Sequence, residues 1–269
     1  MLEGCTMLSG AWGDVSAHEI GATVTSWRPA GREVLFTASD AVIDTADMWH
    51  GGIPCVLPGS GRPRGWAVPF VHGVVPRVRW RLLDASGDDA GARLRYATDA
   101  TATAHLPGAD RFPSDLRYEL EVAADATRLR LDLTVTSPSV AATVEMALHP
   151  YLLTDTRSGR VDGLGGVPFT DFTDGSRGAA DPPVVLGGYL DRVYDAACPA
   201  TVDSAEGRLS LSSEGAESLI VWNPGPANKQ VPGDEWERFV CVEYGCVKGH
   251  PVELPAGGDR RLSMTISVG

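Results

Sequence analysis

The chain has 269 residues, 43% of them hydrophobic, which is enough to build a sizeable core and excludes a disordered chain. Its formal net charge is −12, and an acidic surface repels phosphate backbones, so we expect no nucleic-acid partner. No segment approaches the roughly 20 apolar residues that a membrane span requires, so we expect no membrane partner either.

The start of the chain and its cysteines indicate a compartment. Residues 1–12 show no basic start followed by an apolar run, so no secretory signal is predicted. The five cysteines are odd in number and irregularly spaced, which favours free thiols in a reducing environment. Cys241 and Cys246 lack a second pair at zinc-ligand spacing. We therefore expect a cytoplasmic protein without a metal.

Apolar and polar residues alternate along most of the chain. The clearest runs are 78–82, 116–122, 129–135 and 262–268. Alternation places one side of a strand on a core and the other toward solvent or a second layer. Helical periodicity is almost absent, and most of the 31 glycines and 19 prolines fall between the runs, as turn residues do. This pattern predicts an all-β, antiparallel sandwich with little helix, in which residues 1–269 form one domain.

Three segments break the alternation. Residues 51–70, 157–188 and 223–236 are rich in glycine and proline, with arginine in the first segment and aspartate in the second. Long irregular loops on a compact β scaffold are usually functional or disordered. We predict that these three segments are loops.

His149 is the first candidate for chemistry. Val144, Met146 and Leu148 share one face of a predicted strand, so His149 belongs to the opposite face. It also precedes Pro150, which favours an extended conformation and usually ends strand pairing. A histidine at a strand end, away from the apolar face, is well placed for a cleft. The alternative is a surface or hydrogen-bonded structural histidine.

Glu243 is the second candidate. It lies inside an apolar run at 239–247, where a charged carboxylate is costly to bury unless it is paired. Desolvation raises the pKa of a carboxyl toward neutral pH, which suits a general base. The alternative is a residue that points to solvent from an edge strand.

His72 and Asp191 are weaker candidates. His72 follows a loop and opens the predicted strand that contains Trp80, so it either binds a sugar hydroxyl or caps a turn. Asp191 lies between a glycine-rich loop and a strand-like run, and it either binds hydroxyls or pairs with Arg192.

Five groups of short motifs follow one another along the chain. They are GGIPCVLPGSG at 51–61, HGVVPRVRW at 72–80, ALHPYLL at 147–153, LDRVY at 190–194, and VWNP at 221–224 with PGDEWERFVCVE at 232–243. In this order they resemble the aldose 1-epimerase superfamily, most closely its glucose-6-phosphate 1-epimerase, or hexose-6-phosphate mutarotase, branch. The resemblance implies a galactose-mutarotase-like supersandwich with a sugar in an open cleft.

The resemblance also implies roles for the candidate residues. His149 becomes the general acid and Glu243 the general base, while His72 and Asp191 bind sugar hydroxyls. The implied reaction interconverts the α and β anomers of a hexose or hexose 6-phosphate, without a metal or an organic cofactor. The expected partner is a small-molecule sugar or sugar phosphate, bound by a monomer or weak homodimer.

The chain departs from this branch at its phosphate-binding positions. His50 stands where an arginine is usual, and it is retained as a substrate-binding candidate. Gly59 and Ser60 replace a glutamine or an aromatic pair. Pro76 occupies the place of a second arginine, with Arg77 displaced by one residue and so expected on the opposite face of a strand.

Three arginines are candidates to restore phosphate recognition: Arg62, Arg64 and Arg77. Otherwise the substrate is an unphosphorylated aldose. Two further readings of the whole chain stay open. One is a carbohydrate-binding protein without turnover, and the other is a lyase or glycosidase on the same scaffold, which would want a second catalytic carboxylate or a tyrosine base.

Overall fold

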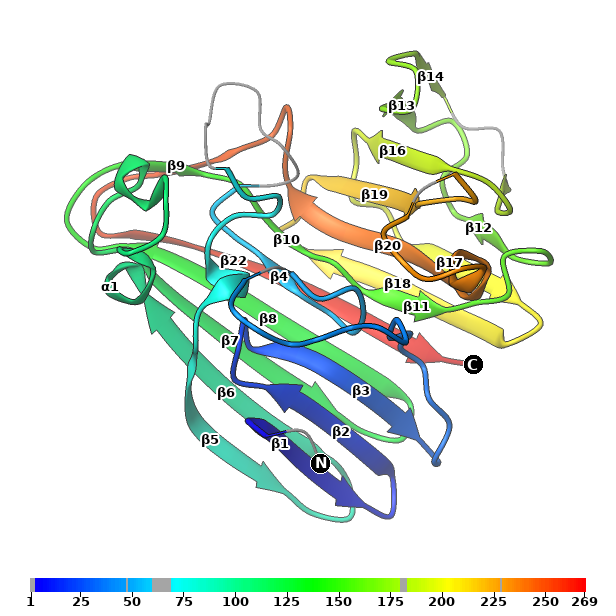
Figure 1. Cartoon of the computed structure of the whole chain (residues 1–269), viewed down its shortest axis with the longest axis horizontal. Helices are drawn as coiled ribbons and strands as arrows, with labels where there is room; N and C mark the ends of the chain where they lie inside the picture. The colour runs from blue at the N-terminus through cyan, green and yellow to red at the C-terminus, as the bar shows by residue number, and fades with distance from the viewer. Residues whose placement is uncertain (1–2, 47, 60–68, 180–182, 228) are drawn as a thin grey trace.

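The computed structural model describes residues 3–46, 48–59, 69–179, 183–227 and 229–269. Antiparallel strands make up most of the described chain (Figure 1). The helical elements are short: α1 (Ala100–Thr103) and the 3-10 turns η1 (Val75–Arg77), η2 (Ala109–Arg111) and η3 (Glu235–Arg238). The prediction of an all-β, antiparallel fold with little helix is confirmed. No helix among the described residues has the length and apolar character that crossing a membrane requires.

Two large sheets dominate the fold. Across the nine-stranded sheet the order is β15 (Val184–Val185), β12 (Arg160–Asp162), β17 (Ala200–Ser204), β18 (Gly207–Glu214), β22 (Gly258–Val268), β8 (Arg128–Ser137), β7 (Arg117–Ala124), β6 (Ala92–Asp99) and β5 (Arg81–Gly87). Across the eight-stranded sheet it is β14 (Arg177–Ala179), β13 (Pro168–Asp171), β16 (Leu190–Tyr194), β19 (Ser218–Asn223), β20 (Phe239–Cys246), β10 (Met146–Leu148) and β4 (Cys55–Val56), with β11 (Tyr151–Leu153) also paired to β20.

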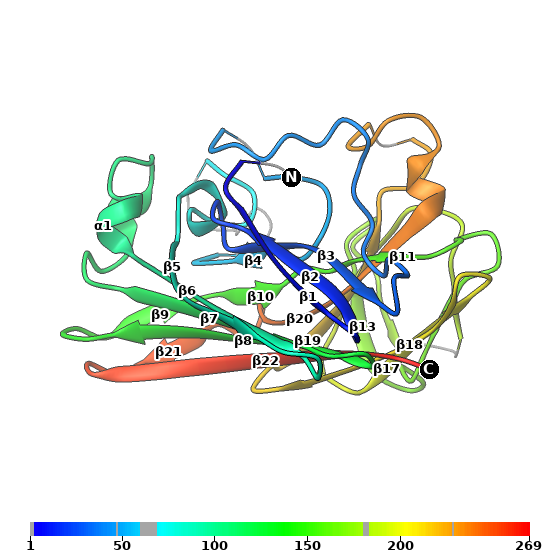
Figure 2. The ribbon, with the colours of Figure 1, turned by 90° about the horizontal axis from the view of Figure 1, so that it is seen from below.

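Two smaller sheets complete the structure. One contains β1 (Cys5–Gly10), β2 (Gly13–His18) and β3 (Thr23–Pro29), and the other β21 (Val252–Leu254) and β9 (Ala142–Val144). Figure 2 shows β1–β3 lying on one side of the layer formed by β7, β8 and β22. Trp27 of β3, Leu131 of β8 and Val242 of β20 belong to one buried cluster, so a single core joins the three larger sheets.

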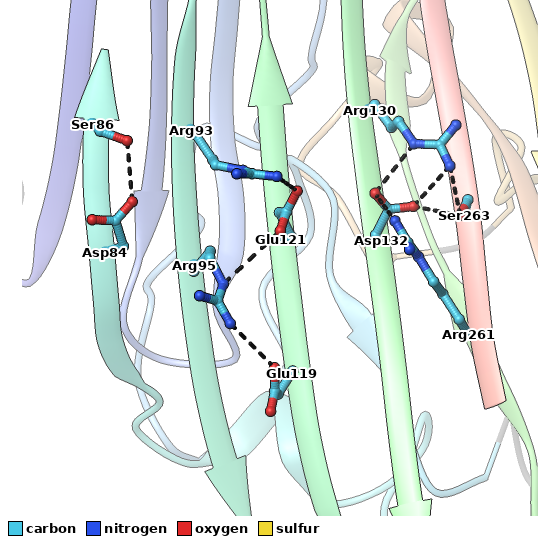
Figure 3. Close-up of polar contacts among 10 residues, drawn as sticks. All are labelled: Asp84, Ser86, Arg93, Arg95, Glu119, Glu121, Arg130, Asp132, Arg261 and Ser263. Carbon is cyan, nitrogen blue, oxygen red and sulfur yellow. Dashed lines mark hydrogen bonds and ion pairs between the residues drawn. The ribbon is translucent and has the colours of Figure 1, made fainter. Parts of the chain in front are cut away.

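The alternating runs explain how the nine-stranded sheet faces this core. Leu120 pairs with Leu133, which also pairs with Leu262, so these leucines lie side by side across β7, β8 and β22, and all are buried. The intervening residues form the solvent face, where charged side chains pair across strands (Figure 3). Arg93 contacts Glu121 there at 2.5 Å. Cross-strand pairs of opposite charge are typical of an exposed sheet face.

The predicted strand over 78–82 is wrong for its first three residues. Strand β5 begins at Arg81, so Trp80 is buried ahead of the strand, whereas Leu82 is 39% exposed. The pairing of β5 with β6 shifts register between Leu82 and Asp84. All seven residues of β5 are exposed, because β5 lies at the edge of the sheet, so the alternation at 78–82 does not mark a buried face of this strand.

The predicted loop at 157–188 is also wrong in part, because it contains β12, β13, β14 and β15. These strands have only two to four residues each, too few to display a clear alternation. The loop predicted at 223–236 is confirmed for its described residues, since regular structure there is limited to the end of β19 and the start of η3.

Candidate active site

His149 and Glu243 meet near the middle of the eight-stranded sheet. His149 lies between β10 and β11, and both of these strands pair with β20, which carries Glu243. The Nε2 atom of His149 lies 3.3 Å from Oε1 of Glu243. The two residues are only 3% and 5% exposed. Strand pairing therefore brings together the imidazole and the carboxylate that the sequence singled out.

Both side chains lie on the face that points away from the shared core. Val242 and Tyr244 belong to the main core cluster, so the alternate residue Glu243 faces the other way. Leu148 also belongs to that cluster, whereas Ala147 belongs to a separate small cluster. The predicted facing of His149, opposite Leu148, is confirmed, and the alternative of a solvent-facing Glu243 on an edge strand is wrong.

Burial shifts the two protonation equilibria in opposite directions. Burial raises the pKa of Glu243 well above its ordinary value of 4.5, the charge of Asp191 raises it further, and the charge of Lys248 opposes this. Burial lowers the pKa of His149 well below 6.5, and the neighbouring His72 acts in the same direction. Both effects disfavour the charged form, so burial favours a protonated carboxyl on Glu243 beside a neutral imidazole on His149.

Aromatic rings fix the orientation of the His149 imidazole. The ring of Tyr151 stacks on it with centroids 4.9 Å apart and planes inclined by 16°. His72 meets it edge-on at 5.1 Å, and Trp222 does so at 6.0 Å. These contacts hold the imidazole with Nε2 toward Glu243, as acid–base catalysis requires.

His72 reaches the site from a turn. Its backbone has φ 68°, in the left-handed region, and the following Gly73 has φ 80°. Burial lowers the pKa of His72 to about 3, with smaller contributions from Lys248 and Arg77 in the same direction. His72 is therefore neutral near pH 7, with one ring nitrogen able to donate and the other able to accept a hydrogen bond. The prediction that it opens a strand is wrong, because η1 follows.

Arg77 supports this turn. It ends η1, so the expectation that it lies on a strand is wrong. Its Nη1 donates to the carbonyls of Val71 and Gly73 at 3.2 and 3.0 Å, and its guanidinium lies 4.6 Å from the ring centroid of Phe70. A buried guanidinium that satisfies backbone carbonyls fixes the loop on both sides of His72. Direct contact with a substrate stays a prediction.

Asp191 lies in β16 on the same face as Glu243. It pairs in register with Trp222 of β19, which in turn pairs with Cys241, two residues before Glu243. Burial raises the pKa of Asp191, and Lys248 opposes the rise. The alternative pairing of Asp191 with Arg192 is wrong, because the Arg192 guanidinium contacts Asp171 at 2.8 Å instead.

The remaining candidates differ in their placement. His50 lies beside Tyr151, with ring centroids 6.4 Å apart, and its charge lowers the pKa values of His72 and His149. Arg62 and Arg64 lie outside the described residues. Within the described ranges, no three or more histidine, cysteine, aspartate or glutamate side chains gather as metal ligands would.

The sequence analysis missed Lys248. This residue follows β20, and its charge acts on His72, Asp191 and Glu243. Its Nζ atom lies 5.0 Å from the ring centroid of Phe172, after β13. Lys248 is exposed, as a lysine in a turn usually is. Only the spatial meeting of β16, β20 and the His72 turn reveals that its charge reaches the candidate residues.

Comparison with known proteins gives one family and one fold. The family model of aldose 1-epimerase matches residues 6–267. The YeaD protein of Salmonella typhimurium, provisionally assigned as a mutarotase, is similar with a TM-score of 0.87 and 24% identity, over 100% of this chain and 92% of that chain. The b2544 protein of Escherichia coli K12, provisionally assigned as an aldose 1-epimerase, is similar with a TM-score of 0.75 and 16% identity, over 99% of both chains.

A galactose mutarotase related enzyme from Lactobacillus acidophilus is similar with a TM-score of 0.75 and 12% identity, over 98% of this chain and 97% of that chain. No curated protein matches. At these identities the structures show the fold alone, which is the galactose mutarotase-like sandwich that the motifs implied.

Proposed function

Because the chain belongs to the aldose 1-epimerase family, we propose that it interconverts the α and β anomers of an aldose, with Glu243 as general base and His149 as general acid. The observation that carries the proposal is the 3.3 Å contact between His149 Nε2 and Glu243 Oε1 on one face of the sheet. A base and an acid held side by side are what ring opening requires, since one proton leaves the sugar as another arrives.

The reaction balances with these two groups alone. Glu243 takes the proton of the anomeric hydroxyl while His149 gives a proton to the ring oxygen, so the C1–O5 bond breaks and an aldehyde forms. The aldehyde turns about the C1–C2 bond. On closure the O5 hydroxyl returns its proton to His149, and Glu243 protonates the new anomeric oxygen. The enzyme is regenerated without a covalent intermediate.

The ionised form of the pair, carboxylate and imidazolium, is the reactive one. Burial disfavours it in the free protein, because both pKa values shift toward the uncharged state. The uncharged pair that burial favours has its proton on the carboxyl, so transfer of this proton from Glu243 to His149 would prepare both catalysts at once. When the sugar binds, its anomeric hydroxyl takes the place of His149 beside Glu243, and its ring oxygen takes the place of Glu243 beside His149.

His72 and Asp191 would hold the sugar in this position. Neutral His72 can donate or accept a hydrogen bond, and the acceptor oxygens of Asp191 suit a pair of hydroxyls. His50 stays a substrate-binding candidate, and Arg77, Arg62 and Arg64 stay candidates for phosphate recognition. A hexose or a hexose 6-phosphate is the proposed substrate.

Polarimetry on fresh α-glucose, α-galactose and α-glucose 6-phosphate tests the proposal. We expect the wild-type protein to accelerate mutarotation of at least one of these sugars above the buffer rate. Calorimetric binding of a sugar without any acceleration would instead support a carbohydrate-binding protein without turnover. No binding and no acceleration with a wider aldose panel would contradict both.

A further inference from the structure

The turn that follows β20 has an unusual backbone. The N–H of His250 donates to the carbonyl of Val247 at 3.1 Å, which closes a turn with Lys248 and Gly249 at its centre. Lys248 has φ 59°, in the left-handed region that disfavours a residue with a Cβ atom. Non-glycine residues held in this region often lie at functional sites. The chain thus places lysine at a position that suits glycine.

A buried acid holds this conformation. Glu145, between β9 and β10, is 5% exposed, and its Oε1 accepts the backbone N–H of Lys248 at 2.5 Å. The carbonyl of Glu145 accepts the N–H of Gly59 at 3.0 Å. A hydrogen bond to a carboxylate is stronger than one between neutral groups. Glu145 therefore fixes where the side chain of Lys248 leaves the backbone.

The side chain of Lys248 is exposed, and its ammonium lies beside a residue that is hydrogen-bonded to Asp191. The ammonium lies 5.0 Å from the ring centroid of Phe172, and the N–H of Phe172 donates to the carbonyl of Asp191 at 2.7 Å. In the described part of the chain, Lys248 makes no ion pair within 4.0 Å with a carboxylate. Its charge nevertheless lowers the pKa values of Asp191 and Glu243. The contact with Phe172 therefore places the cation on the segment that follows β13 and is hydrogen-bonded to Asp191.

We propose that Lys248 is a specificity-determining residue that recognises an anionic substituent, a phosphate or a carboxylate, on the aldose. This inference rests on the proposed function, whose substrate class it narrows. The protein carries a net charge of −12, so an anionic sugar needs a local positive group at the point of binding. A lysine ammonium is a compact point charge on a flexible stem, which suits either anion.

The kinetic test compares anionic with neutral sugars. The quantity measured is the ratio of kcat/KM for glucose 6-phosphate, and separately for glucuronate, to kcat/KM for glucose. For the favoured anion we expect Lys248→Met to lower this ratio about tenfold and Lys248→Arg to retain most of it. Lys229→Met is the matched control, because it removes the charge of the chain's other lysine, which is exposed. A ratio that Lys248→Met leaves unchanged for both anions overturns the proposal.

Glucose 6-phosphate and glucuronate distinguish recognition of a phosphate from recognition of a carboxylate. A fall for glucose 6-phosphate alone assigns a phosphate, and a fall for glucuronate alone assigns a carboxylate. If Lys248 acted only by lowering the pKa of Glu243, Lys248→Met would slow every sugar equally and leave the ratio constant. That outcome would contradict recognition while leaving the epimerase function intact.

A second measurement needs neither turnover nor a variant. The chain has two lysines, so acetylation of the native protein followed by mass spectrometry compares Lys248 directly with Lys229. We expect glucose 6-phosphate or glucuronate to slow acetylation of Lys248 several-fold more than glucose does, with Lys229 unaffected. Equal protection of Lys248 by glucose and by the anionic sugars would overturn the proposal. Absence of mutarotation with such protection would instead count against the epimerase function alone.

Discussion

The Nε2 atom of His149 lies 3.3 Å from the Oε1 atom of Glu243, with both side chains buried on the same face of the eight-stranded sheet. The contact depends on the pairing of β10 and β11 with β20, and it joins two segments that are far apart in the chain. Burial in this position favours the uncharged forms of both groups, and the proposed chemistry needs the charged ones. Burial therefore opposes the ionisation that the proposed reaction requires.

The pH dependence of kcat/KM should reflect the pair rather than two independent groups. Burial raises the pKa of Glu243 above its ordinary value of 4.5 and lowers the pKa of His149 below its ordinary value of 6.5. We therefore expect the acid limb, set by protonation of His149, below pH 6.5, and the alkaline limb, set by ionisation of Glu243, above pH 4.5. Initial mutarotation rates in a series of non-nucleophilic buffers check this. An acid limb centred at or above pH 6.5, or an alkaline limb centred at or below pH 4.5, would show that burial does not shift the pair as described.

His72 should make the fold sensitive to acid. Burial lowers its pKa to about 3 in the folded protein, whereas an unfolded histidine protonates near 6.5, so the folded state binds fewer protons between these values. The stability present above pH 6.5 is lost as the pH falls toward 3. His72→Gln should reduce this loss by an amount on the order of 1 kcal/mol between about pH 7 and pH 5. Urea unfolding at both pH values measures it, and an unchanged difference would argue that His72 is not desolvated.

No other residue should replace Gly73 without a loss of stability, because the surrounding backbone leaves no room for a side chain. It has φ 80°, and a Cβ atom there would lie 2.0 Å from the carbonyl oxygen of Leu57. Gly73→Ala should therefore cost several kcal/mol and displace His72, whereas Gly166→Ala should cost only about 1–2 kcal/mol. Gly166 is the matched control, because it has φ 74° and no atom within 4 Å of the added Cβ. Equal losses in thermal unfolding would contradict the steric argument.

Asp132 on the solvent face of the nine-stranded sheet should stabilise the fold without affecting activity. Its carboxylate contacts Arg130 at 3.1 Å and Arg261 at 2.6 Å, and it accepts the hydroxyl of Ser263 (Figure 3). The side chain is only 8% exposed, so Asp132→Ala leaves partly buried donors without their acceptor. We expect a loss of about 1–3 kcal/mol in the free energy of unfolding, with kcat/KM unchanged.

Glu121→Ala on the same face is the control for Asp132. The Glu121 side chain is 28% exposed and pairs with Arg93, so its removal should cost less than about 1 kcal/mol. The Asp132 contribution should also depend on acid. Although burial alone raises the pKa of Asp132, the hydrogen bonds from Arg261, Ser263 and Arg130 lower it below its ordinary 3.8. Its stabilisation is therefore present above pH 3.8 and is lost below. Equal costs for both variants at neutral pH would contradict this account.

The alternating runs were enough to predict the sandwich, because Leu120, Leu133 and Leu262 line up where period two places them. The same reasoning failed at Leu82, because β5 is an edge strand whose seven residues are all exposed. The place of a strand at the edge of a sheet depends on the pairing of the whole sheet, which a five-residue run does not contain.

The site was predictable where the chemistry of a single residue conflicts with its surroundings, as for Glu243 in an apolar run and His149 before a proline. Arg77 was misplaced because η1, rather than a strand, carries it. Lys248 was missed because its significance depends on three segments that meet only in space. The 3.3 Å separation of His149 from Glu243 also depends on strand register, which short motifs do not encode.

Exchange NMR on equilibrated sugar tests the central claim most directly, because it reports anomer interconversion without net reaction. The wild-type protein should show cross-peaks between the α and β anomeric protons of its sugar. Glu243→Gln and His149→Gln should each lower the exchange rate by about 10²–10⁴-fold while the sugar still binds. Both substitutions change the volume of the side chain little, and circular dichroism is the check that each variant is folded. Wild-type exchange rates in both variants would contradict the assignment of this pair as the acid and the base.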